Sequence, residues 1–74
     1  MMTDIGRTVG FSVNGEARAL AGPMTVADLL VALGLDERKV AVERNEAIVP
    51  RSVYSTTWLA PGDSLEIVHF IGGG

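Results

Sequence analysis

Hydrophobic and polar residues alternate in the first part of the chain, which is the pattern of a β-strand with one buried face. Val9, Phe11 and Val13 share one side of this strand. Asn14-Gly15 follows directly, and both residue types tolerate the positive φ that a type I′ hairpin turn requires. A second alternating run leads from the turn to Leu20. The pattern therefore predicts a β-hairpin at the start of the domain.

Helical spacing of apolar residues begins after residues 21–23, an Ala-Gly-Pro segment that ends the second predicted strand. The positions i, i+3, i+4 and i+7 are occupied by Val26, Leu29, Leu30 and Leu33. Thr25 and Asp28 have the spacing of a capping box, and Gly34 is able to end the helix with a positive φ. We therefore expect a helix over 26–33 whose apolar face packs on the hairpin.

Two short strands and a turn-rich connection make up the middle of the chain. Residues 40–44 and 47–49 are extended runs on either side of an Asn45-Glu46 turn, and Pro50 stops the second run, which suits an edge strand. In the connection that follows, Ser52 is expected to cap a single helical turn.

The rest of that connection leads into the last strand. Trp58 and Leu59 are expected to pack beneath the connection, and Pro61-Gly62-Asp63 is a turn signal. The final run, 65–70, is the least polar strand, so we place it in the centre of the sheet, parallel to the first strand.

The predicted order of elements is β-β-α-β-(β)-β. It indicates an α+β fold of the ubiquitin-like β-grasp type, with a mixed sheet of four to five strands and one main helix packed across one face. We expect a disordered or non-native leader at 1–7, a β-grasp domain over 8–71 and a flexible glycine tail at 72–74.

Composition narrows the classes of function. The 74 residues allow one domain, and a domain of this size buries only about 60% of its unfolded-chain surface, which leaves little room for an enclosed substrate pocket. The net charge of −3 argues against nucleic-acid binding, and the lack of cysteine excludes a disulfide framework and a thiol nucleophile. No membrane span or signal peptide is visible, so we expect a cytoplasmic protein.

Side chains suited to catalysis are scarce. His69 is the only histidine, and strand alternation places it on the side of Leu65 and Ile67, where a packed or half-buried position is favoured over a general base. One histidine without cysteine does not make a zinc site, so we expect no bound metal and no bound cofactor. Val68 and Phe70 then point away from the core, which makes them a candidate partner-docking surface.

The glycines at the end of the sequence are the strongest candidate for chemistry. Gly72, Gly73 and Gly74 follow the last strand through Ile71. A tail without side chains can enter a narrow cleft and present its terminal carboxylate there. A carboxylate with a pKa of about 3.5 is a poor electrophile and must be activated, for example as an acyl-adenylate formed from ATP. The chain has no ATP site of its own, so the activating enzyme must be a separate protein.

Several segments of the sequence resemble the ThiS family, the sulfur carriers of thiamin thiazole biosynthesis. They are 13–16 at the first turn, 25–30 at the start of the helix, 40–45 in the third strand, 48–51 and 61–74. The resemblance covers about residues 8–74. Each segment alone is a weak signal, and it is their order, their spacing and the terminal Gly-Gly that are specific.

The resemblance implies a carrier function. The Gly74 carboxylate would be adenylated by an E1-like, ThiF-type enzyme and then converted to a thiocarboxylate with sulfur from a donor protein. That sulfur would pass to a ThiG-type thiazole synthase. The chain would be a regenerated protein substrate and not an enzyme, and Ile71, Gly72 and Gly73 would form the tail that its partners bind.

Two alternatives remain open at this point. A MoaD-type molybdopterin sulfur carrier or a ubiquitin-like modifier shares the Gly-Gly end, but MoaD-type chains tend to be longer and to approach the glycines through a proline, where this chain has His69-Phe70-Ile71. The other alternative is a TGS-like β-grasp module that binds RNA or protein without sulfur chemistry, and the negative net charge counts against it.

Overall fold

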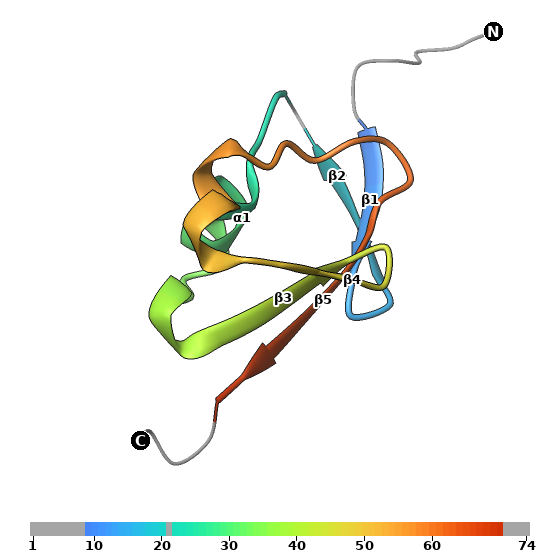
Figure 1. Cartoon of the computed structure of the whole chain (residues 1–74). Coiled ribbons are helices and arrows are strands. Elements are labelled where there is room, and N and C mark those ends of the chain that lie inside the picture. The colour runs from blue at the N-terminus through green and yellow to red at the C-terminus, as the bar shows by residue number, and fades with distance from the viewer. Residues whose placement is uncertain (1–8, 21, 71–74) are drawn as a thin grey trace, which may run out of the picture.

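A five-stranded mixed sheet with one α-helix across one face forms the domain (Figure 1). The computed structural model describes residues 9–20 and 22–70. Its elements are β1 (Val9–Val13), β2 (Glu16–Leu20), α1 (Val26–Ala32), the 3-10 helix η1 (Glu37–Lys39), β3 (Val40–Arg44), β4 (Ala47–Val49), the 3-10 helix η2 (Arg51–Thr56) and β5 (Ser64–His69). The predicted leader at 1–7 and the predicted tail from Ile71 to Gly74 lie outside the described residues.

The sheet order is β2-β1-β5-β3-β4. β5 pairs in parallel with β1 and antiparallel with β3, so the last strand lies in the centre of the sheet, as the sequence predicts. β4 lies at the edge, as Pro50 directly after it indicated. The arrangement confirms the β-grasp expectation.

The β1–β2 hairpin forms through the Asn14-Gly15 turn. Both residues have positive φ, 52° and 83°, as a type I′ turn requires. The register places Phe11 opposite Arg18 and Val13 opposite Glu16. Residues directly opposite each other point to the same face of a sheet. The charged residues of β2 therefore share the helix-covered face with the apolar residues of β1, beyond the area that α1 covers.

Helix α1 begins and ends through local hydrogen bonds that the sequence predicts. The Thr25 hydroxyl accepts from the Asp28 N–H and the Asp28 carboxylate accepts from the Thr25 N–H, both at 3.1 Å, which completes the capping box. At the other end the Gly34 N–H donates to Val31 O at 3.0 Å and the Leu35 N–H donates to Leu30 O at 2.8 Å. These are the two bonds of a Schellman motif, and Gly34 has the positive φ that it requires.

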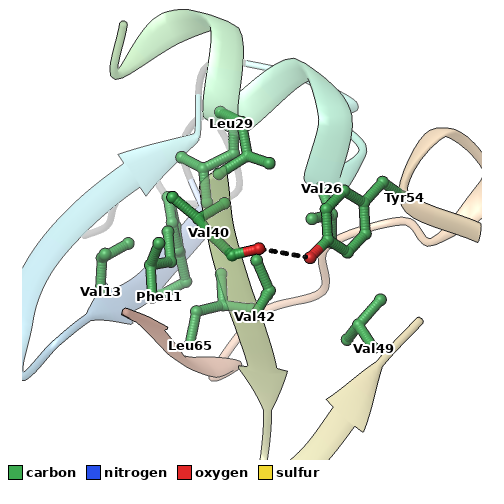
Figure 2. Close-up of a cluster of buried hydrophobic side chains, with 11 residues drawn as sticks. Phe11, Val13, Val26, Leu29, Val40, Val42, Val49, Tyr54 and Leu65 are labelled. Carbon is green, nitrogen blue, oxygen red and sulfur yellow. Dashed lines mark hydrogen bonds between the residues drawn. The ribbon is translucent and has the colours of Figure 1, made fainter. Parts of the chain in front are cut away.

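The core lies between α1 and the sheet. Figure 2 shows Phe11 and Leu65 from the sheet facing Val26 and Leu29 of the helix. Tyr54, from η2, closes one side of this core and its hydroxyl donates to Val40 O at 3.5 Å. Because all described buried apolar side chains belong to this one cluster, the opposite face of the sheet has no core of its own.

A buried carboxylate fixes the turn that leads into β5. Asp63 is only 5% exposed, and burial alone would raise the pKa of its carboxyl group. Hydrogen bonds from Arg44 Nε at 2.8 Å, the Ala60 N–H at 2.8 Å and Asn45 Nδ2 at 3.1 Å outweigh burial and lower the pKa below its ordinary value. The start of β5 is therefore tied to the turn between β3 and β4.

Two details of the connection before β5 differ from the expectation. Ser52 is not a cap, because η2 begins at Arg51 with Pro50 at its N-terminal boundary, so Ser52 already lies inside the turn. Trp58 is 57% exposed, whereas Leu59 packs against the core. Neighbouring residues of an extended segment point to opposite sides, so the inward position of Leu59 turns Trp58 to solvent.

Replacing Thr25 with alanine removes the side-chain half of the capping box. We expect Thr25→Ala to lower the free energy of unfolding by about 1 kcal/mol, measured by chemical denaturation. Thr56→Ala is the matched control, because among the described residues this exposed hydroxyl bonds only to Val53 O in η2, and it should change stability by less than ~0.5 kcal/mol. Equal stability of the two variants would contradict the assigned helix start.

Candidate functional site

The carboxyl end of β5 is the candidate site, because it leads into the predicted tail. In Figure 1, β5 runs through the middle of the sheet and its last residues project from the body of the domain. The pairing with β3 places His69 opposite Val40 and Val68 opposite Ala41. One residue later the Phe70 N–H still donates to Lys39 O at 2.9 Å. The chain is therefore held by β3 up to Phe70.

The side chains of Val68 and Phe70 are 60% and 55% exposed. Leu65 and Ile67, which alternate with them, are buried beneath α1. Their predicted orientation away from the core is confirmed, and the reason is that the part of the chain that the structure describes covers only one face of the sheet. Exposed apolar groups at the end of a central strand are typical of a surface that contacts another protein.

Negative charge lies directly beside this apolar surface. Glu66 stands opposite Glu43 in the β3–β5 register, next to Val68 on the open face of the sheet. Two like charges in directly opposite positions of neighbouring strands repel each other. A partner that brought a positive group to this pair would relieve the repulsion.

His69 lies on the helix side of the sheet, as strand alternation predicts. The structure places it at the rim of a groove of about 300 Å³. Val13, Leu33, Leu35 and Ile67 line the apolar part of this groove. The expectation that His69 is packed or half-buried is wrong, because its side chain is exposed beyond the area that α1 covers.

One residue of this site was recognised in the sequence only as a turn former. The Asn14 side chain bridges to β5 through two bonds: its Oδ1 accepts from the Ile67 N–H at 2.8 Å, and its Nδ2 donates to Ile67 O at 3.2 Å. The primary amide acts here like a peptide group of a neighbouring strand. No sequence signal identifies this contact, because the two residues lie 53 positions apart.

The described residues contain no cluster suited to metal binding. Over 9–20 and 22–70, no group of three His, Cys, Asp or Glu side chains could hold a metal ion. The same part of the chain has no helix that is long and apolar enough to cross a membrane. The predicted site residues Ile71, Gly72, Gly73 and Gly74 lie outside the described part.

The sequence as a whole matches a known family. A model described as the ThiS family matches residues 11–74. The chain belongs to this family. The relatives described next carry the name ThiS, which favours this alternative over the MoaD-type carriers and the TGS-like modules.

Solved and curated relatives agree with the assignment to the ThiS family. The chain is similar to the crystal structure of the thiamine biosynthesis protein (ThiS) from Geobacter metallireducens, with a TM-score of 0.76 and 32% identity, over 89% of this chain and 100% of that one. It is 44% identical to the sulfur carrier protein ThiS of Bacillus subtilis over 50 residues, or 68% of this chain and 76% of that protein.

A further relative is much longer than this chain. The thiazole synthase of Paramagnetospirillum magneticum is 58% identical over 62 residues, which is 84% of this chain. The chain spans only 19% of the length of that protein. A segment similar to this ThiS-family domain is therefore part of a larger protein in that organism.

Removing the Asn14 side chain tests its bridge to β5. We expect Asn14→Gly to lower the free energy of unfolding by about 1–3 kcal/mol, because two partly buried hydrogen bonds are lost while the turn conformation stays accessible. The amide hydrogen of Ile67 should exchange faster with solvent, which nuclear magnetic resonance measures directly.

Glu46→Gly is the control for the effect of glycine itself. Glu46 occupies the second position of the Asn45-Glu46 turn with a φ of 71°, and within residues 9–20 and 22–70 its side chain forms no hydrogen bond. This variant should be as stable as the wild type or more stable, because glycine relieves the strained backbone. If Asn14→Gly behaves in the same way, the bridge does not stabilise β5.

Proposed function

We propose that this ThiS-family chain is a sulfur carrier of thiamin thiazole biosynthesis and that Gly74 carries the sulfur as a thiocarboxylate. The observation that carries the proposal is the match of the chain to the sulfur carrier protein ThiS of Bacillus subtilis along most of both sequences. The proposal takes Gly74 as the terminal residue of the working carrier. The exposed apolar residues where β5 leads into the tail support it.

The proposed chemistry takes place on the terminal carboxylate. One carboxylate oxygen of Gly74 attacks the α-phosphorus of ATP, which forms a carboxyl–phosphate bond and releases pyrophosphate. A nucleophilic sulfur at the oxidation level of sulfide, delivered by a sulfur donor protein, then forms a bond to the acyl carbon. AMP leaves with one of the original carboxylate oxygens, and the product is the thiocarboxylate.

The partners follow from this chemistry. A ThiF-type, E1-like enzyme binds ATP and adenylates the tail, so the carrier itself needs no bound cofactor and no catalytic residue. A ThiG-type thiazole synthase receives the sulfur. The occurrence of a similar segment within the thiazole synthase of Paramagnetospirillum magneticum supports this second partner. The use of ATP by the first partner favours a cytoplasmic location.

Val68 and Phe70 form the docking surface in this proposal. Their apolar side chains lie on the open face of the central strand, directly before the tail. The adjacent pair of Glu43 and Glu66 favours a partner surface that places arginine or lysine around an apolar centre. A partner docked here would receive the tail without any rearrangement of the core.

The length of the tail tests the proposed reaction most directly. Adding one alanine after Gly74 moves the carboxylate by about 3.3–3.6 Å, and a misplacement of ~1 Å can already reduce a rate about a hundredfold. We expect this variant, and the deletion of Gly74, to abolish ATP–pyrophosphate exchange with the activating enzyme. Thermal stability should stay within ~0.5 kcal/mol of the wild type.

Mass spectrometry completes this experiment. The protein isolated from its native cell should end at Gly74 and carry a mass increase that matches the exchange of one oxygen for sulfur. If either tail variant exchanges pyrophosphate at the wild-type rate, with an intact mass that excludes trimming, the proposed function is wrong.

A charge on the docking surface should weaken partner binding more than folding. We expect Phe70→Asp to reduce the affinity for the activating enzyme or thiazole synthase by at least about tenfold, because it places a carboxylate in an apolar contact. Val31→Asp is the control, because Val31 is 78% exposed on α1, away from the open face of the sheet. Equal affinities of the two variants in isothermal calorimetry would exclude Phe70 from the docking surface.

A further inference from the structure

The backbone of β5 directs its hydrogen-bonding groups alternately to its two neighbours. On the side of β3, the Phe70 N–H donates to Lys39 O at 2.9 Å and Ser64 O accepts from the Asn45 N–H at 2.8 Å. On the side of β1, Asp63 O accepts from the Ser12 N–H at 2.9 Å, and Leu65 O accepts from the Asn14 N–H at 2.8 Å. The backbone N–H and C=O groups of the even-numbered residues of β5 therefore point to β3, and those of the odd-numbered residues point to β1.

On the β1 side, the pairing is much shorter than β5 itself. In the described part of the chain, β5 pairs with β1 only at Ser64 and Leu65, because β1 ends at Val13 and the hairpin turns back. The Asn14 side chain occupies the next position and bonds to Ile67. The following odd-numbered residue is His69, whose N–H and C=O point past the hairpin turn, where no described strand continues.

The groove beside this open edge is suited to a side chain. Ile67 and His69 line it from β5, and Leu33 and Leu35 line it from the end of α1. Glu16 and Arg18 of β2 line its polar side, and its volume of about 300 Å³ accommodates a large side chain against the apolar side. An added strand sends alternate side chains to each face of the sheet, so a strand next to His69 would direct one of them to the groove.

We propose that an extended segment of the activating enzyme pairs with β5 at His69 and places an apolar side chain in this groove. The inference rests on the proposed function and adds a defined contact to it. Open strand edges are templates for such pairing, in which main-chain bonds give affinity and side-chain pockets give specificity. The contact is continuous with the tail, because Phe70 and the residues after it follow directly.

This contact explains how the tail would reach the ATP of the activating enzyme from a defined starting point. Gly74 lies five residues beyond His69 in the sequence, and five extended residues span about 17 Å. Glycine residues lose more conformational freedom than others when they are ordered. A strand paired at His69 fixes the point from which the tail starts, so the enzyme has to order only the residues beyond it.

Amide hydrogen exchange of the full-length 15N-labelled chain tests the pairing. In the free chain the amides of Ile67 and Phe70, which have acceptors within the domain, should exchange slowly, and that of His69 should exchange rapidly. Saturating ThiF-type enzyme should slow exchange at His69 by at least about tenfold. The proposal is overturned if the His69 amide exchanges slowly in the free chain or if its exchange is unchanged in the complex. New protection at Ala17 and Ala19 of β2 instead would also overturn it.

A pair of substitutions at His69 separates its backbone from its side chain. His69→Pro removes the N–H that faces away from β3, and it leaves the bonds to β3 intact. We expect it to weaken binding to the activating enzyme by about tenfold, as the loss of one intermolecular hydrogen bond implies. His69→Ala loses the same imidazole but keeps the N–H, so it should bind about tenfold more tightly than His69→Pro. Equal affinities of the two variants would contradict strand pairing.

Groove-filling variants keep the test decisive if proline disturbs the fold. Arg18→Trp fills the groove from β2, whereas Val31→Trp places the same side chain on the exposed side of α1, away from both the groove and the open face of the sheet. Only the first should weaken binding, by about tenfold. If the wild-type chain supports ATP–pyrophosphate exchange while the amide hydrogen of His69 stays unprotected, this contact alone is refuted. If the wild-type chain neither binds the activating enzyme nor supports ATP–pyrophosphate exchange, the proposed function is refuted as well.

Discussion

The hydrogen bonds that hold β5 between β1 and β3 are the interaction on which the rest of the structure depends. β5 is the strand that connects the hairpin at one end of the sheet to the β3–β4 pair at the other. Its buried residues, Leu65 and Ile67, support α1, and its exposed residues form the candidate docking surface. One strand therefore stabilises the fold and ends directly before the predicted tail.

Most of the local structure could be predicted from the sequence. The hairpin turn, the capping box at Thr25, the glycine that ends the helix and the central position of the last strand each follow from residues that are close in sequence. Tertiary contacts of polar side chains could not be predicted. Asn14 was recognised only for its turn conformation, and Asp63 only for its place in a turn signal, because their partners lie far along the chain.

The prediction error at His69 comes from the limited reach of α1. Alternation shows which side of a strand a residue occupies, but it does not show how far the covering helix extends. α1 has only seven residues and leaves the ends of the sheet uncovered. A side chain on the inner face at the end of β5 is therefore exposed, and the same lack of cover creates the groove beside it.

The parallel pairing of β1 with β5 has a consequence for the order of folding. It joins segments about fifty residues apart, with Ser12 opposite Ser64, so most of the chain must be enclosed in a loop before these bonds can form. Contacts of such long range form late, because the entropy of closing the loop opposes them until other parts are in place. A chain that has not finished folding therefore lacks the ordered strand that precedes the glycines. Under the proposed function, charging of the tail would in this way be limited to native molecules.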